Sequence, residues 1–493
     1  ALGPGTSHTL EWAVYPTESG DYYDFVNAFR KAENRISTVQ GAPGFLSREV
    51  PKRQLLEKLN LKIGIFSCIF QAADDPELGL EGIEFVNYPL EMQLLKKQAA
   101  AIHAQYPDLK VVFHVAHSLF ATNKPDTFSD SKVIDANGEH ASWGDGSTFG
   151  GRKKEEGWRW WIYYPAPGNS FHEALLASAD TIMNDLGMNG VFMDGFLAGY
   201  GGPWTYDDRW DGHSADMEIS TKTIKRKVSS VLLLSQPSLI EFARKIHGKG
   251  GVVVANNTVF TRSIANEKHI IFDNECASGP QLHFAPNLVV LSRQSLTTQR
   301  ECYLDMLDKL RWGSLWMSYG ENWGEFSRPD NPSLAARQFP ITFEEIRAGM
   351  VRGKERIVTM NSGVYGWPKS RSLHLAYKFD EQGTSVPNDF TTTVDNAGVR
   401  TQIALNFNEA AVMEPIPVTI DSGAAVNARV ISYDSAGIRL ILNGSGNVVV
   451  KIQSGAFPIV PGGRYRVVSG KGETTVTETA GVVLIATNLQ GQT

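Results

Sequence analysis

Three carboxylates stand directly after short apolar runs, where they could carry out acid–base chemistry. Asp194 closes the run 190–193, and Asp273 and Glu275 follow the run 270–272. Runs of this length are consistent with buried strands, and parallel α/β proteins place reactive groups at the carboxyl ends of such strands. Hydrolysis of a glycosidic bond needs one acid that protonates the leaving oxygen and a second carboxylate that acts as nucleophile or base. The pattern therefore predicts a catalytic pair of Asp194 with one of the two later acids.

The choice between the two later acids depends on their surroundings. Glu275 lies further out, has the longer side chain and precedes the small pair 276–277. We therefore expect desolvation and the charge of Asp194 to raise the pKa of Glu275 and make it the acid/base. Asp273 is the alternative acid/base, and is otherwise suited to hold a sugar hydroxyl. Ion pairing of the later acids with nearby arginine or lysine, and a turn-capping role for Asp194 before Gly195, are the structural alternatives.

Eight apolar runs, separated mostly by helical patterns, would position these groups. Their size and rhythm match the α/β class and a (β/α)8 TIM barrel, in which residues just past each strand converge on one face. A doubly wound open sheet is the alternative, but no Gly-rich phosphate loop follows the first run. The predicted strands are 61–66, 109–115, 160–164, 190–194, 251–255, 270–272, 288–291 and 315–319.

The texture of the sequence predicts three parts. Residues 1–46 carry one alternating run, 10–15, and a helical face at 21–30. Because a lone strand is not stable in water, this segment is expected to be a remnant of, or a partner to, a β-domain. Residues 47–355 form the predicted catalytic barrel. Residues 356–493 alternate between short strands and turns rich in Gly, Asn and Asp, which predicts an antiparallel β-sandwich with a structural or carbohydrate-binding role.

Aromatic and polar side chains gather where the other predicted strands end. Indole and phenol faces stack on sugar rings, and amide, imidazole and carboxylate groups bond to hydroxyls, so these residues predict a carbohydrate substrate. Long aromatic loops after the third and fourth predicted strands indicate a pocket closed from several sides, and hence exo action. The candidate substrate-binding residues are His114, His117, Trp158, Tyr163, Trp204, Trp210, Asp211, His213, Asn256, Asn257, Arg293, Tyr319 and Glu321.

Composition excludes several other classes of function. The chain has 493 residues and a net charge of −6, so it lacks the basic footprint of a nucleic-acid-binding protein. No run is long enough to predict a membrane span. Three widely spaced cysteines and the absence of HxH, HExxH or DxDxD spacing predict no metal and no cofactor. No strand end carries a lysine for Schiff-base chemistry. Oligomeric state and compartment stay open, with a secreted or periplasmic location favoured over a cytoplasmic one.

The run 191–196 resembles the nucleophile motif of TIM-barrel glycoside hydrolases of the α-galactosidase-like clan. The resemblance implies that Asp194 is the nucleophile closing strand four, that a carboxylate on a later strand is the acid/base, and that a β-sandwich follows the barrel. It also implies a retaining double-displacement mechanism. The chain departs from many α-galactosidases at Phe192, where they carry lysine. A carbohydrate-binding barrel without activity, and a metal-dependent sugar isomerase or lyase, are the alternative functions.

Overall fold

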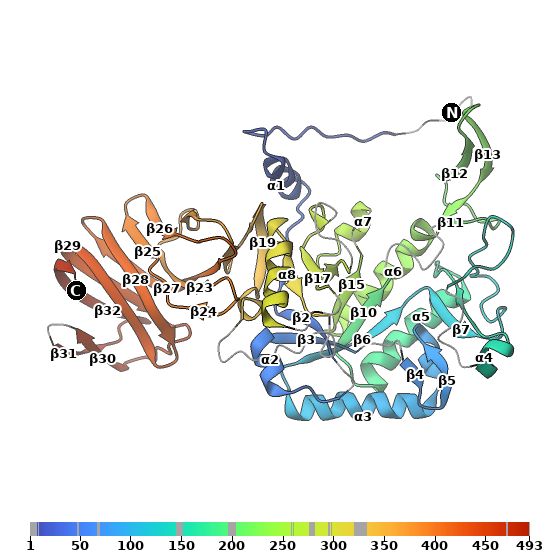
Figure 1. Cartoon of the computed structure of the whole chain (residues 1–493), viewed down its shortest axis with the longest axis horizontal. Coiled ribbons are helices and arrows are strands. Elements are labelled where there is room, and N and C mark those ends of the chain that lie inside the picture. The colour runs from blue at the N-terminus through green and yellow to red at the C-terminus, as the bar shows by residue number, and fades with distance from the viewer. Residues whose placement is uncertain are drawn as a thin grey trace.

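The chain has a mixed α/β fold followed by a region of antiparallel strands, as Figure 1 shows. The computed structural model describes residues 7, 9–46, 49–66, 70–143, 151–195, 204–257, 259, 261–275, 282–293, 296, 298–319, 333–469 and 472–492. No helix in these ranges is long and apolar enough to cross a membrane.

A six-stranded parallel sheet forms the centre of the α/β part. Its strands are rich in Val, Ile and Phe and are almost entirely buried, as expected where both faces of a parallel sheet are covered. The spatial order is β16-β15-β10-β6-β3-β2. The bounds are β2 (Ala42–Leu46), β3 (Leu61–Phe66), β6 (Lys110–Ala116), β10 (Gly190–Asp194), β15 (Val252–Asn256) and β16 (Ile270–Asp273).

A parallel pair of strands, β17 (Val289–Leu291) and β18 (Leu315–Met317), is tied to both edges of this sheet. The Leu291 amide donates to the carbonyl of Asn274, directly after β16, at 3.2 Å. The Phe45 amide, in β2, donates to the carbonyl of Ser318 at 3.0 Å. Backbone hydrogen bonds among the described residues therefore connect β16 to the β17–β18 pair, and that pair to β2.

One of the eight predicted barrel strands is wrong, and one parallel strand was missed. The run 160–164 overlaps β9 (Arg159–Ile162), which pairs antiparallel with β7 (Leu119–Thr122) and β8 (Ser142–Trp143) in a separate small sheet. The missed strand is β2, because its residues Pro43 and Gly44 are typical of turns. The two errors offset each other, so Asp194 still closes the fourth parallel strand along the chain.

Helices and shorter elements pack around the parallel strands (Figure 1). Side-chain caps fix several helix starts: Asn169 accepts from the His172 amide, and Thr298 with Glu301 forms a capping box. The helices are α1 (Tyr22–Ala32), α2 (Arg53–Leu59), α3 (Pro89–Gln105), α4 (Gly151–Glu155), α5 (Ser170–Asp180), α6 (Val231–Gly248), α7 (Arg262–Ala265) and α8 (Gln299–Arg311). The other short strands are β4 (Phe70–Ala72), β5 (Asp75–Leu80), β11 (Trp204–Thr205), β12 (Ala215–Glu218), β13 (Thr223–Lys227) and β14 (Ser229–Ser230).

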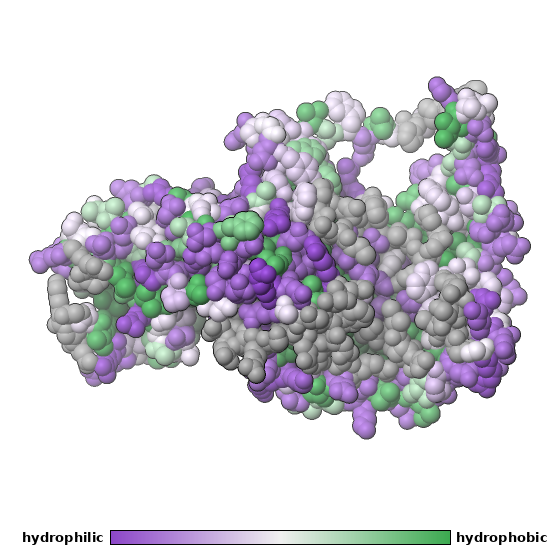
Figure 2. Space-filling view, in the orientation of Figure 1, coloured by the Kyte–Doolittle hydropathy of each residue, from purple (hydrophilic) through white to green (hydrophobic). Residues whose placement is uncertain are grey.

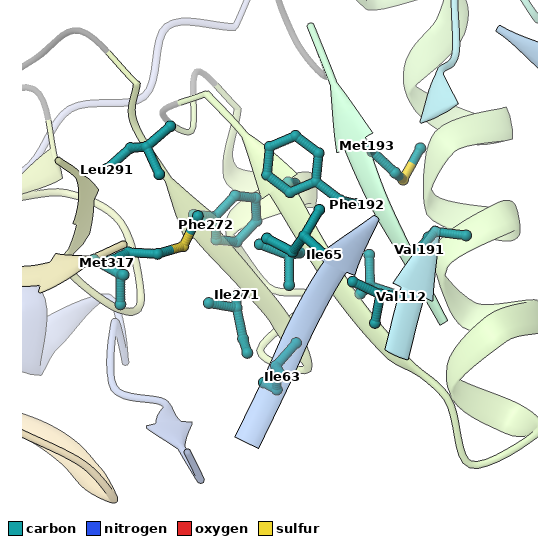
Figure 3. Packing of buried hydrophobic residues seen from close by; sticks show 14 of the residues in the cluster. Ile63, Ile65, Val112, Val191, Phe192, Met193, Ile271, Phe272, Leu291 and Met317 are labelled. Atoms are coloured by element: carbon teal, nitrogen blue, oxygen red, sulfur yellow. The ribbon is translucent and has the colours of Figure 1, made fainter. Parts of the chain in front are cut away.

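The two faces of β10 bury different side chains. Figure 3 shows Val191 and Met193 pointing toward the helices and Phe192 pointing to the other side, near Ile65 of β3. The Phe192 ring lies 5.1 Å from the rings of both Phe45 and His114. Because side chains alternate along a strand, Asp194 lies on the same face as Phe192, one step nearer the strand end.

The N-terminal segment differs from its prediction. The helix expected at 21–30 is present as α1, but residues 9–20 form no strand or helix. The strand that joins the antiparallel sheet is β1 (Thr38–Val39), which pairs with β19 (Ile341–Arg347). In Figure 1 the described part of the segment runs from α1 toward the β12–β13 hairpin.

The antiparallel region begins earlier than residue 356, because β19 and β20 (Met350–Gly353) already belong to it. It is a thirteen-stranded sheet with a separate hairpin, β30–β31, and has its own buried core, which includes Leu373, Val418 and Val450. The remaining strands are β21 (Ile357–Thr359), β22 (Gly363–Tyr365), β23 (Ser372–Phe379), β24 (Ser385–Val386), β25 (Thr391–Asp395), β26 (Gly398–Ile403), β27 (Ala410–Ser422), β28 (Val426–Asp434), β29 (Gly437–Gln453), β30 (Arg464–Ser469), β31 (Gly472–Thr477) and β32 (Val482–Gln492).

Candidate active site

The carboxyl ends of β10, β15 and β16 bring three polar side chains to one edge of the sheet. Asn256 pairs with Asp273 in the β15–β16 register. Phe192 pairs with Val254, so Asp194 comes opposite Asn256 on the same face. Glu275 lies two residues beyond Asp273. All four residues were predicted as site residues, and the structure brings them together.

Asn256 connects the two predicted catalytic carboxylates. Its Nδ2 donates to Asp194 Oδ1 at 2.7 Å and to Glu275 Oε2 at 3.0 Å. The Glu275 amide in turn donates to Asn256 Oδ1 at 3.4 Å. Since 2.7 Å and 3.0 Å add to 5.7 Å, the two carboxylate oxygens that share this nitrogen lie no farther apart than 5.7 Å.

Tyr319 and Phe45 continue the chain of contacts on the other side of Glu275. The Tyr319 hydroxyl donates to Glu275 Oε1 at 3.0 Å. The Phe45 ring stacks on Tyr319 at 5.4 Å between centroids and 19° between planes. Tyr319 was predicted, whereas Phe45 was missed together with β2. An aromatic residue two positions after Pro43 was the only signal in the sequence.

Two histidines contact Asp194. His114 Nε2 lies 3.4 Å from Asp194 Oδ2, and His117 Nδ1 lies 3.1 Å from the backbone oxygen of Asp194. Burial lowers the pKa of His117 to about 4, so this imidazole is neutral near neutral pH and carries its proton on Nδ1 to donate to that oxygen. Both histidines therefore contact Asp194 directly.

The environment of Asp194 favours its charged form. Burial alone raises the pKa of this carboxyl. The neighbouring His114, the Asn256 amide and the Gly195 amide, which donates at 2.9 Å, outweigh that effect and hold the pKa below its usual value. Asp194 is therefore ionised at neutral pH.

The environment of Asp273 favours its neutral form. It is fully buried, and neither carboxylate oxygen has a hydrogen-bond partner among the described residues. Burial, followed by the charges of Asp194 and Glu275, raises its pKa well above the usual value. We expected the raised pKa at Glu275, yet the structure assigns a strong upward shift to Asp273, because Asp273 lies deeper and lacks donors.

Glu81 is a site carboxyl that sequence reasoning missed. Its backbone oxygen accepts from the amide of Ala116, which pairs with Asp194 in the β6–β10 register. The side chain is buried, and burial together with the charges of Asp194 and Glu84 raises its pKa to about 8. The β4–β5 hairpin separates Glu81 from β3 along the chain, so the strand pattern gave no signal for it.

Three predicted residues are held by contacts outside this cluster. Tyr163 is buried beyond β9, and its hydroxyl donates to the carbonyl of Pro125 at 2.8 Å. Trp158 lies under the Lys153 ammonium, 4.5 Å from its ring centre. Arg293 pairs with α8, at 3.2 Å from Asp305 and 2.7 Å from Asp308. Tyr163 and Trp158 lie apart from the carboxylates because the strand next to them, β9, belongs to another sheet. Arg293 is held by the two acids of α8, and a substrate-binding role for these three residues stays a prediction.

Four predicted residues lie in the long loop after β10. Asp211 fastens this loop: it accepts from Ser214 and from the amides of His213 and Ser230. Trp204 lies in β11, and Trp210 donates from its indole to the Ser214 carbonyl; both indoles are nearly half exposed. These contacts therefore shape the loop itself.

The two remaining predicted site residues are Asn257 and Glu321. The Asn257 amide donates to the carbonyl of Asp273 at 3.0 Å. Glu321, residues 276–277 and Cys68 lie outside the described residues, whereas Cys302 is a buried free thiol. Within the described ranges no three His, Cys, Asp or Glu side chains are grouped to hold a metal ion.

No family model matches the chain, and no curated protein matches it. Solved structures with a similar backbone include the cycloalternan-forming enzyme from Listeria monocytogenes in complex with a pentasaccharide substrate, at 8% identity and a TM-score of 0.44. That match covers 95% of this chain and 56% of the Listeria chain, so this chain spans about half of it. An α-amylase from Anoxybacillus matches at 13% identity and a TM-score of 0.39, covering 75% of this chain and 89% of that chain. An α-amylase from Malbranchea cinnamomea matches at 8% and 0.37, covering 76% and 96%. None of these three is an α-galactosidase, and the resemblance to that clan stays a prediction.

Proposed function

We propose that the chain is a retaining glycoside hydrolase with Asp194 as nucleophile and Glu275 as acid/base. The observation that carries the proposal is the Asn256 amide bonded to both carboxylates, which limits the distance between the shared oxygens to 5.7 Å. Retaining enzymes hold their two carboxyl groups about 5–5.5 Å apart, and inverting enzymes about 6.5–9.5 Å apart. The contacts of Asp194 support its charged form, which the nucleophile requires.

The proposed reaction has two displacements. Asp194 attacks the anomeric carbon while Glu275 transfers its proton to the leaving oxygen, so the glycosidic bond breaks as the covalent glycosyl–enzyme forms. Glu275, now ionised, then takes a proton from water, whose oxygen attacks the anomeric carbon and releases Asp194. The neutral carboxyl of Asp273 lies beneath the pair and adds no negative charge to the site.

The substrate we propose is a neutral glycoside. The cluster carries the negative charge of Asp194, and Arg293 is already paired with two acids. A sugar carrying a carboxylate or phosphate would therefore meet like charge. Phe45 stacked on Tyr319 supplies an aromatic face for the ring. Exo action is part of the proposal, because long aromatic segments follow β6 and β10 in the sequence.

We also propose the finer architecture that this chemistry needs. The backbone bonds from Leu291 to Asn274 and from Phe45 to Ser318 support a closed (β/α)8 barrel made of the eight parallel strands. The separate core around Val418 supports a sandwich arrangement of the antiparallel sheet. The predicted division at 1–46, 47–355 and 356–493 becomes 1–41, 42–340 and 341–493 in this proposal, because β2 belongs to the parallel sheet and β19 to the antiparallel one.

The test is a panel of p-nitrophenyl glycosides with the wild type and Asp194→Asn. We expect release of p-nitrophenol from at least one glycoside, a loss of several orders of magnitude in the variant with an unchanged fold, and a first-formed sugar of the substrate's own anomeric configuration by NMR. Wild-type-like rates in Asp194→Asn would refute the nucleophile, and an inverted product would refute the mechanism. Binding of sugars without hydrolysis would show a carbohydrate-binding barrel instead.

A further inference from the structure

An open cavity lies away from the carboxylate cluster, between the N-terminal segment and the α/β part of the chain. Its volume is about 650 Å³, and it is lined by residues of the segment 10–15, the end of α1 with the turn after it, and α7 with the turn before it. In Figure 2 the described part of the segment stands off from the body with open space beneath it. A cavity of this volume can hold a small molecule or several sugar units.

Arg35 is the deepest polar side chain of the cavity. The residue is only 4% exposed. Its Nη1 donates to Asn266 Oδ1 at 3.2 Å, and its Nη2 lies 3.7 Å from Glu33. These two contacts hold the guanidinium group at the wall of the cavity.

The charges that line the cavity balance each other. Arg262 lies 2.8 Å from Glu11 and 3.3 Å from Glu33, and the Tyr15 hydroxyl donates to Glu33 at 3.0 Å. With Arg35, the lining therefore holds two guanidinium groups and two carboxylates. An anion would meet the carboxylates and a cation the guanidinium groups. A neutral ligand with many hydroxyls can donate to the acids and accept from the arginines.

Aromatic rings complete the lining. Trp12 stands at the opening with 80% of its surface exposed, and is therefore free to stack on a ligand. Tyr15 contacts Phe29 edge-on at 5.6 Å, and Phe29 contacts Phe284 at 4.9 Å, so these rings are held in place. An exposed indole next to balanced charges suits the apolar C–H face and the hydroxyls of a sugar.

We propose that this cavity is a second binding site, and that its ligand is a neutral oligosaccharide. Residues 257–261 connect the end of β15, where Asn256 lies, to α7, so the cavity borders the same end of the sheet as the carboxylate cluster. A site there holds a carbohydrate chain beside the carboxylates. It does not depend on hydrolysis being the reaction.

The test is isothermal titration calorimetry of Asp194→Asn with neutral malto-, cello-, xylo- and manno-hexaoses and with an oligogalacturonate of equal length. We expect at least one neutral hexaose to bind, and Trp12→Ala in this background to weaken that binding by about tenfold or more. Phe407→Ala is the matched control, because Phe407 is equally exposed, at 81%, but lies in the antiparallel region. In the wild-type background, kcat/KM for a p-nitrophenyl monosaccharide should not change with Trp12→Ala.

Three other outcomes overturn the proposal, and a fourth separates it from the proposed function. Equal affinities in Trp12→Ala and Phe407→Ala refute the site. Tighter binding of the oligogalacturonate refutes the neutral ligand. Failure of every hexaose to bind refutes the inference even if p-nitrophenyl glycosides are hydrolysed. Absence of hydrolysis together with Trp12-dependent binding refutes the proposed function and supports this site.

Discussion

Replacing Asn256 with alanine removes a nitrogen that donates to both carboxylates of the proposed pair. The two bonds are 2.7 Å to Asp194 and 3.0 Å to Glu275. A hydrogen bond to a charged group contributes about 1.5–3 kcal/mol, and one pKa unit corresponds to about 1.36 kcal/mol. We therefore expect the pKa of Asp194 to rise by about one unit or more in Asn256→Ala.

Repulsion between the carboxylates acts in the same direction. Two unit charges at the limiting separation of 5.7 Å repel by about 3 kcal/mol at an effective dielectric constant of ~20. With no amide between them, one carboxylate stays protonated to a higher pH. Because Asp194 must be ionised to attack, the acid limb of kcat/KM should move to higher pH by about one unit or more.

The assay is kcat/KM on the best p-nitrophenyl glycoside from about pH 3 to about pH 9. Tyr319→Phe is the matched control, because it removes a donor to Glu275 but keeps the ring that stacks on Phe45. Its acid limb should stay in place, since the Tyr319 hydroxyl donates to Glu275 and the Asn256 amide that donates to Asp194 is kept. An unshifted acid limb in a folded Asn256→Ala, or equal shifts in both variants, would refute the bridging role.

Three further predictions test the remaining groups. Glu275→Gln should lose most activity on glycosides with poor leaving groups, keep glycosylation of activated aryl glycosides and regain turnover with azide. Asp273→Asn should lose activity on both kinds of glycoside, and azide should not restore it. If the two variants exchange these behaviours, Asp273 is the acid/base. Glu81 holds its proton to about pH 8 when folded and releases it far lower when unfolded, so its contribution to stability falls as pH rises between about 5 and about 8. Glu81→Gln should therefore raise Tm more at pH 8 than at pH 5, and an equal change at both would contradict the buried proton. Gly82→Ala would place a Cβ 1.9 Å from a backbone oxygen of β7 and should cost about 1–3 kcal/mol in urea unfolding, while Gly248→Ala, with open space around it, should cost little.

The sequence predicted which residues lie together in the candidate site where local pattern and chemistry agree. The buried run of β10 placed Asp194, and the runs of β15 and β16 placed Asn256, Asp273 and Glu275, because each strand ends at its first polar residue. It could not show that the Asn256 amide donates to both carboxylates, since these hydrogen bonds join three strands that are distant in sequence. The depth of Asp273, and hence its raised pKa, depends on packing that no local pattern contains.

The failures follow from elements that look alike in one dimension. The strand β2 contains Pro43 and Gly44, which normally mark turns. In the structure it is nevertheless the first strand of the parallel sheet along the chain. The strand β9 has the apolar, aromatic composition of a barrel strand but pairs antiparallel with β7. The strand β19 follows soon after helical sequence, so the change to antiparallel structure was placed too late.

The pairing of β1 with β19 has a consequence for the order in which the chain assembles. Thr38 and Thr342 are hydrogen-bonded partners 304 positions apart, and β2 follows β1 directly. During synthesis the first parallel strand emerges long before β18, so its edge stays without its partner until residue 318 has been made. Contacts of such long range slow folding and leave partly assembled chains prone to aggregation. Phe45 stacks on Tyr319 only after β18 has been made, so a nascent or truncated chain that ends between Glu275 and β18 contains every proposed catalytic carboxylate and still lacks the aromatic pair beside them.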